Sequence, residues 1–285
     1  MRRFAVRPAL RRIALPTVAA TVASLVSLVI VSPGAHAEAG PTAVGAVGTV
    51  YGLGDNQYAS LGLNGHQFPD QFGLISVDAS ITPITGVIQA AAGQSVGLVL
   101  TSAGTVLASG DNSANGLATG TAAGTQDYFA PVNGLPNNIV KVAAGYQAAM
   151  ALASDGSVYV WDSVPVRPGH ASGVVTTPEL ENYFPVGVTI VDIATDGFAM
   201  YFLGGNGLVY ATGVNGFGEL GNGTTSPSAT PVQVLTAPGG PPLTNVTKVV
   251  AGTGLLLPTF CAIDTSHDLW CWGSSSFSRQ CPSDS

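Results

Sequence analysis

Basic residues are scarce in this chain. Five of its nine lysines and arginines lie within the first 12 residues. The others stand apart from one another among 16 acidic residues: Lys141, Arg167, Lys248 and Arg279. Proteins that bind duplex nucleic acid need grouped lysines and arginines to displace phosphate counterions. We therefore predict no nucleic-acid partner, and the acidic balance favours solubility.

Histidine is as rare, which bears on metal binding and catalysis. His36 lies near the N-terminus, and the remaining ones stand in polar loops without a partner at ligand spacing: His66, His170 and His267. We therefore predict no metal site and no cofactor. The stretch GQSVG (93–97) matches a nucleophile elbow, but that motif needs a helix behind its serine, Ser95. The following residues are typical of a strand hairpin, so we expect no catalytic residue and no enzyme.

Aromatic residues make up 7% of the chain, which leaves few platforms for stacking a sugar. The three tryptophans fall on expected strands, where they would pack between sheets: Trp161, Trp270 and Trp272. No amphipathic helix stands out beyond the N-terminal segment. Short Val/Leu/Tyr runs alternate instead with Gly, Asn, Asp and Pro, which predicts an all-β chain.

The N-terminal segment, residues 1–37, has the features of an export signal. An arginine-rich start precedes an apolar run of 15 residues, Thr17–Val31, and small residues at Ala35 and Ala37 predict cleavage before Glu38. The alternative is an uncleaved membrane anchor, but a span needs about 20 apolar residues. We expect a secreted or cell-surface protein with one domain over 38–285 and no stable membrane insertion after cleavage. Twin arginines permit Tat export without establishing it.

Internal repeats organise the rest of the chain. Four segments align with one another, and an incomplete copy, Gly48–Asn56, precedes them: Ile88–Asn112, Val140–Ser163, Val191–Asn215 and Thr247–Ser275. Repeats of this length cannot bury an apolar face alone and pack against their neighbours. We expect about five units of about 52 residues.

Each repeat reads as a hairpin between two fixed points. The first point, the anchor position, falls at Gly93, Gly145, Asp196 and Gly252. The second is a tight turn 11 residues later, at Gly104, Gly156 and Gly207, where glycine accepts a positive φ. The fourth repeat is longer between these points, and we expect Asp268 at its turn.

Two groups of polar residues have ordinary structural explanations. The pairs Asp55–Asn56 and Asp111–Asn112 recur at equivalent points, and such side chains cap turns. A calcium site is the alternative. Glu179 and Glu181 are two positions apart and are expected in a solvated loop.

Two of the three cysteines, Cys261 and Cys271, face each other across the expected fourth hairpin. Opposed β-carbons in an antiparallel pair lie about 4.5–5.5 Å apart, and disulfides favour about 3.5–4.5 Å. A non-hydrogen-bonded pair would therefore suit a disulfide, and an exported protein meets oxidising conditions. The alternative is two buried thiols. Cys281 has no evident partner and could pair between chains.

The repeats resemble a known family. The stretches VAAGYQAAMALASDGSVYVW (142–161) and GVNGFGELGNG (213–223) are similar to the regulator of chromosome condensation repeat. The cysteine-bearing FCAIDTSHDLWCWG (260–273) looks like the version found in exported bacterial members. The resemblance implies a β-propeller, a ring of four-stranded sheets. The family usually places histidine three positions after the anchor, where this chain has Val96, Ala148 and Ala199.

The repeat count implies a smaller ring than is usual in the family, an open propeller-like arc, or a shortened array. TVYGLGDN, Thr49–Asn56, could complete the last sheet.

We expect a non-enzymatic exported protein that binds an unknown protein partner through loops on one face. The candidate loops are the most variable segments: Gly65–Gly86, Ser163–Phe184 and Thr236–Asn245. One alternative is a carbohydrate-binding protein of the cell surface or wall. Another, which the resemblance implies, is a secreted inhibitor of β-lactamases.

Overall fold

The computed structural model describes residues 2–4, 29–31, 51–53, 61, 73–74, 76–77, 82–113, 116–121, 123–146, 148–164, 173–252 and 259–273. Within these ranges every regular element is a β-strand. The strands form four four-stranded sheets and one three-stranded sheet. The all-β class and the repeated sheets predicted from the sequence are confirmed.

Three sheets are simple meanders in chain order. The first holds β5 (Val87–Ala92), β6 (Val96–Thr101), β7 (Val106–Asp111) and β8 (Thr125–Pro131). The second holds β9 (Ile139–Ala144), β10 (Ala148–Ala153), β11 (Val158–Val164) and β12 (Gly173–Glu181). The third holds β13 (Ile190–Thr195), β14 (Ala199–Gly204), β15 (Val209–Gly213) and β16 (Ser228–Gln233).

The other two sheets include strands from the N-terminal segment. The last sheet runs in the order β1 (Arg2–Phe4), β19 (Leu269–Gly273), β18 (Thr259–Asp264) and β17 (Val246–Ala251). The three-stranded sheet holds β2 (Val29–Val31), β3 (Tyr51–Leu53) and β4 (Gly73–Leu74).

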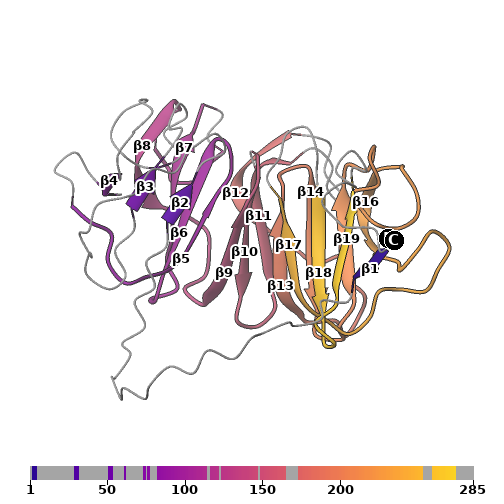
Figure 1. Ribbon diagram of the computed structural model, residues 1–285. Helices are drawn as coiled ribbons and strands as arrows, with labels where there is room; N and C mark the ends of the chain where they lie inside the picture. The colour runs from indigo at the N-terminus through magenta and orange to yellow at the C-terminus, as the bar shows by residue number, and fades with distance from the viewer. Residues whose placement is uncertain are drawn as a thin grey trace, which may run out of the picture.

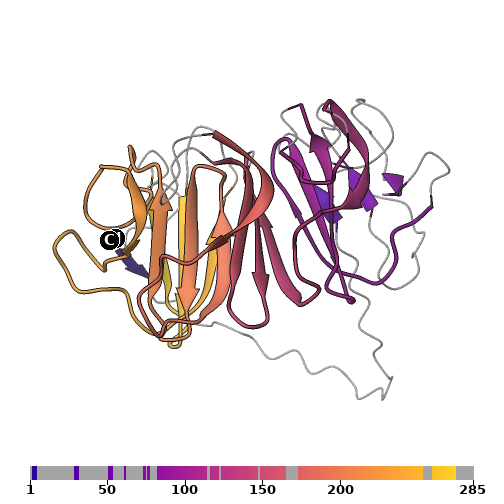
Figure 2. The same ribbon diagram turned by 180° about the vertical axis from the view of Figure 1, so that it is seen from behind.

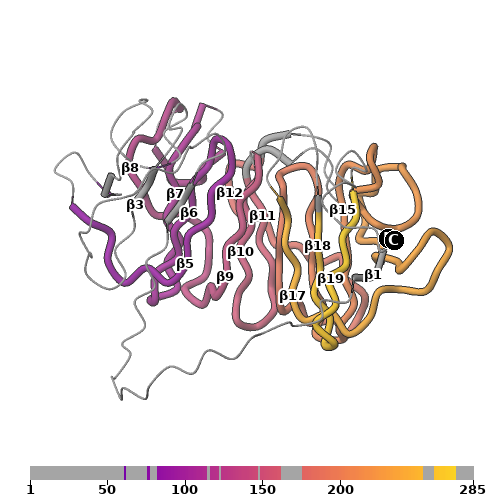
Figure 3. Tube along the Cα trace, viewed as in Figure 1, coloured from indigo at the N-terminus to yellow at the C-terminus, as the bar shows by residue number. Residues whose placement is uncertain are grey.

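The sheets stand one after another like the blades of an open fan (Figures 1 and 2). The first strands β5, β9, β13 and β17, here called the inner strands, contact one another in that order. The β9–β12 sheet stands between the β5–β8 sheet and the later ones, and the Cα trace follows the same row (Figure 3). The predicted propeller-like row of repeat sheets is therefore confirmed.

The prediction for the N-terminal copy was wrong. Strand β3 pairs with β2 and β4, and the strand that completes the last sheet is β1, which pairs with β19. An unpaired strand edge accepts any extended segment that reaches it, so the repeat pattern alone does not select the partner. Both β1 and β2 come from residues 1–37, the predicted export signal.

The hairpin turns follow the predicted chemistry in three repeats and differ in the fourth. Gly104, Gly156 and Gly207 have φ values of 74°, 88° and 74°. The matching residue of the fourth repeat is His267, with φ 65°, rather than Asp268. The amide of His267 donates to Asp264 O, the bond that Gly207 makes to Gly204 O. The fourth repeat is therefore longer than the others by one residue fewer than the sequence comparison predicts.

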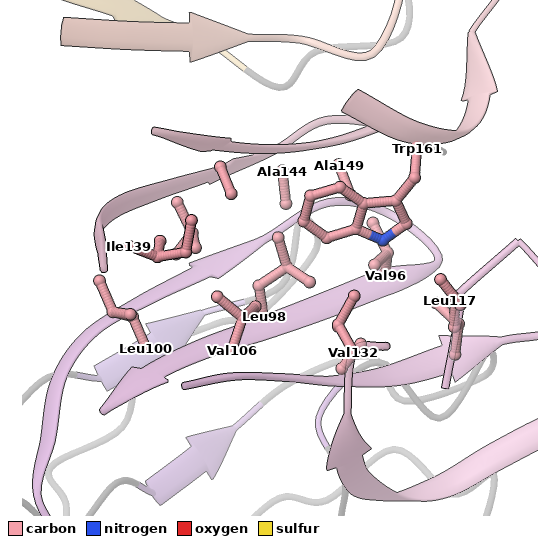
Figure 4. Close-up of a cluster of buried hydrophobic side chains, with 14 of the residues drawn as sticks. Val96, Leu98, Leu100, Val106, Leu117, Val132, Ile139, Ala144, Ala149 and Trp161 are labelled. Carbon is pink, nitrogen blue, oxygen red and sulfur yellow. The ribbon is translucent and has the colours of Figure 1, made fainter. Parts of the chain in front are cut away.

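Apolar side chains fill the seams between neighbouring sheets. Figure 4 shows the seam between β5–β8 and β9–β12, where Trp161 lies over Val96 and Leu98. Trp161 is fully buried, and Trp270 and Trp272 pack partly buried against the seam between the third and last sheets. The expectation that the tryptophans pack between sheets is confirmed.

The structure joins Cys261 and Cys271 in a disulfide across β18 and β19. The two residues are direct partners in the register, with Cα atoms 4.2 Å apart. That short separation is typical of a non-hydrogen-bonded pair, the geometry expected from the sequence.

Candidate protein-binding surface

The turns at the anchor positions lock neighbouring sheets together. The amide and the hydroxyl of Ser95 both donate to Tyr146 O, at 3.2 and 3.0 Å. The amide of Tyr146 in turn donates to Asp196 O at 2.8 Å. Bonds between turns of different sheets leave little freedom for either turn. The described parts of the three anchor turns (93–95, 145–146 and 196–198) therefore form a rigid row.

The row requires very close approach of the backbones. A β-carbon at Gly93 would overlap the carbonyl of Gly145, and one at Gly145 would overlap the backbone of Gly197. Glycine is the residue that allows such contact. Close packing between the turns thus explains why glycine stands at the anchor positions 93 and 145.

The direction of the strands divides the loops between two ends. Because the β5–β8, β9–β12 and β13–β16 sheets are antiparallel meanders, the turn between the first two strands of each and the connection between its last two lie at the same end. We name this the anchor-turn end. The hairpin turns and the connections to the next sheet lie at the opposite end, the hairpin-turn end.

Three partly or largely exposed aromatic residues belong to turns and connections at the anchor-turn end. The rings of Tyr146 and Phe198 stack with centroids 5.4 Å apart, and both are partly exposed. Phe217, in the connection between β15 and β16, is 62% exposed. That connection is tied to the same turn, since the amide of Val214 donates to Phe198 O at 2.9 Å. The sequence signal for this group was an aromatic residue in each of two adjacent anchor turns.

Buried asparagines shape the long connections at this end. Asn112 Oδ1 accepts from the amide of Leu117, and Asn215 Oδ1 accepts from the amide of Leu220. Asp111 accepts from the amide of Ser113. Turn capping, predicted for the Asp111–Asn112 pair, is confirmed. Asp55 and Asn56 lie outside the described residues.

Asp196 is the one acidic residue among the anchor positions. Its Oδ1 accepts from the amides of Phe198 and Ala199, each at 2.8 Å, and its buried Oδ2 has no hydrogen-bond partner. Burial, together with the charge of nearby Glu219, raises the pKa of Asp196 to about 6. Burial also raises the pKa of Tyr201, whose hydroxyl donates to Glu219 O.

Ser95 and the two glutamates singled out in the sequence have structural roles. Ser95 is buried, its hydroxyl donates to Tyr146 O, and strand β6 rather than a helix follows it. Glu179 and Glu181 lie on strand β12, where Glu181 is 7% exposed, so their placement in a solvated loop was wrong. The alternation along β12 turns Glu181 inward.

The described parts of the predicted binding segments do not share a face. Within Ser163–Phe184, residues 163–164 end β11 and residues 173–181 form β12, whereas residues 165–172 lie outside the described part of the chain. Thr236–Asn245 joins β16 to β17 and lies at the hairpin-turn end. Most of Gly65–Gly86 lies outside the described residues, as do His66, His170 and Cys281. The sequence alone could not show at which end of the sheets each segment lies, because that depends on the direction of the strands that the segment joins.

The described ranges contain no group of three histidine, cysteine or acidic side chains placed to hold a metal ion. They also contain no helix with the length and apolar character to cross a bilayer.

Four-stranded repeat sheets standing radially side by side define a β-propeller. Two sequence profiles of the regulator of chromosome condensation (RCC1) repeat match the chain, one at residues 206–257 and the other at 139–161. These two stretches of the chain are therefore similar to the RCC1 repeat.

Solved structures show the same fold. Human WBSCR16 superposes with a TM-score of 0.62 and 22% identity, over 78% of this chain and 56% of that one. Yeast RCC1 (Prp20), solved with bound Kap60, gives 0.60 and 20%, over 78% and 51%.

Sequence relatives include alsin of Pan troglodytes, 28% identical over 139 residues, and alsin of Homo sapiens, 27% identical over the same length. The match covers 48% of this chain and 8% of alsin. The chain thus spans about half of the solved chains that it resembles and under a tenth of alsin.

Proposed function

We propose that this chain is an exported, non-enzymatic propeller protein that binds a protein partner at its anchor-turn end. The observation that carries the proposal is the rigid row of anchor turns with Tyr146, Phe198 and Phe217 beside it. Aromatic side chains on a rigid support are the commonest anchors of protein interfaces, because they bury a large area with little loss of conformational freedom.

Two further facts support the proposal. The solved yeast relative was crystallised with a protein bound to it, which makes protein binding a reasonable use of the fold. Trp161 cannot serve as a sugar-binding platform, because it is fully buried. Export rests on the arginine-rich start and apolar run of residues 1–37. Cleavage at Ala37 would remove β1 and β2 and leave β19 as a free edge.

The test compares two exposed aromatic residues at opposite ends. Phe217 lies at the anchor-turn end, and Tyr183, 46% exposed, lies between β12 and β13 at the hairpin-turn end. The protein is used as bait on culture supernatant and cell-wall extract, with mass spectrometry as the readout. We expect Phe217→Ala to lose the partner and Tyr183→Ala to keep it.

The opposite pattern, with loss on Tyr183→Ala alone, would move the site to the hairpin-turn end. Retention of glycan without protein would replace the proposal with carbohydrate binding.

A further inference from the structure

A β-bulge recurs at the same place in every inner strand. The register of each inner strand shifts around one residue, which is left out of the ladder: Ile88, Val140, Val191 and Thr247. A bulge residue of this kind no longer alternates with its neighbours and turns out of the sheet. In all four sheets the residue lies five positions before the anchor.

Three of these residues are apolar and exposed. Ile88 is 54% exposed, Val140 is 51% exposed and Val191 is 53% exposed. One edge of each inner strand pairs with the second strand, and the sheet faces are packed against neighbouring sheets. Each of these residues is the second of its strand, so they meet solvent near the hairpin-turn end of the inner strands. Because the inner strands contact one another in order, the three side chains form one row, here called the axial row.

The residue after three of the four bulges ties its inner strand to a neighbouring one. Gln89 bonds to both backbone groups of Val142 on the next inner strand, at 2.8 and 2.9 Å. Asp192 Oδ2 accepts from the amide of Val249 on β17 at 3.2 Å, and Lys141 forms an ion pair with Asp192. These bonds fix the spacing of the inner strands, so the axial row is a rigid surface.

Positive charge is concentrated beside this row. The two lysines of the chain, Lys141 and Lys248, occupy the same repeat position, with Asp192 between them. Lys248 is exposed and makes no ion pair with a carboxylate among the described residues. Burial and the charge of Lys248 lower the pKa of Lys141 to about 8, although the ion pair with Asp192 favours its charged form. Among the described residues, Asp192 thus pairs with the ammonium group of Lys141 and not with that of Lys248.

We propose that the axial row binds an extended segment of a partner protein in which apolar side chains alternate with carboxylates. The apolar side chains would cover Ile88, Val140 and Val191, and a carboxylate would pair with Lys248. Attraction between Lys248 and a carboxylate would make the surface prefer acidic segments. Burial of the exposed apolar area would contribute affinity. This site is separate from the anchor-turn end, because it lies on the strands rather than on their connections.

The experiment uses the full chain and a fluorescein-labelled peptide of alternating leucine and glutamate. Anisotropy titration should show binding that weakens with salt. The matching peptide of leucine and lysine should bind at least about tenfold more weakly. Lys248→Gln should weaken binding about 2- to 5-fold, the range for an exposed ion pair.

The apolar contribution has its own variants. Val140→Thr together with Val191→Thr should weaken binding at least about 5-fold. Val186→Thr is the matched control, because Val186 is fully exposed and lies outside the axial row. Melting temperatures should stay equal, since all three valines are exposed.

The proposal is overturned by equal affinity for both peptides, by no binding at millimolar peptide, or by full binding in the double variant. Phe217→Ala should leave peptide binding unchanged, which separates this site from the anchor-turn end.

Discussion

Replacing Asp196 with asparagine should stabilise the protein at pH 7.5 and do much less at pH 4. The carboxyl group is 2% exposed, and only its Oδ1 is hydrogen-bonded. Asparagine keeps that acceptor and removes the buried charge. The substitution therefore isolates the cost of holding an ionised carboxylate at this anchor position.

The magnitude follows from the pKa of Asp196. A rise from 3.8 to about 6 means that the folded protein holds this proton more tightly than the unfolded chain does. The free energy of unfolding therefore falls as the pH rises between these values, by about 3 kcal/mol in total. We expect Asp196→Asn to recover about 2 kcal/mol above pH 6, because its amide nitrogen would stand unpartnered where Oδ2 was.

The assay is urea unfolding followed by tryptophan fluorescence from pH 4 to pH 8. Asp155→Asn is the control: Asp155 is an exposed turn residue that accepts from the amide of Ser157, and its substitution should bring no gain at any pH. A gain from Asp196→Asn that is equal at pH 4 and pH 8 would refute the argument, since it could not come from ionisation.

Three other predictions concern stability. His267→Gly should raise the free energy of unfolding by about 0.5–1 kcal/mol, because glycine adopts the positive φ without steric cost; lower urea stability would contradict this. Gly145→Ala should destabilise by about 2–4 kcal/mol through backbone overlap, while Gly216→Ala, which has open space, should be neutral. The double variant Cys261→Ser and Cys271→Ser should lose about 2 kcal/mol; an intact mass of the parent protein unchanged by reductant would argue against the bond.

Local chemistry explains what the sequence could predict. Three features are recognisable because each depends on residues close together in the chain: the glycine of three hairpin turns, the Asp111–Asn112 cap and the facing cysteines. The constant spacing of the repeats then predicted that similar sheets would stand side by side. Trp161 could be assigned to a seam because its strand alternates between two buried faces.

The features that were missed depend on contacts between repeats. The bond from Gln89 to Val142 spans 53 positions, and the one from Asp192 to Val249 spans 57. No local pattern distinguishes these side chains from ordinary exposed polar residues. The recurring bulge was invisible for a similar reason, since an extra residue shows only once the partner strand is in register. His267 was missed because an insertion can be placed at several points of an alignment.

The bonds between inner strands also bear on how such a chain can change in evolution. Tandem repeats gain and lose units by recombination between equivalent copies. Here Lys141 meets the carboxylate of Asp192 in the following unit. Deletion of that unit would set Lys141 directly against Lys248, with two like charges and no acid between them. The residue at this repeat position therefore distinguishes one repeat from the next, and loss of the repeat that contains Asp192 would be disfavoured by charge repulsion.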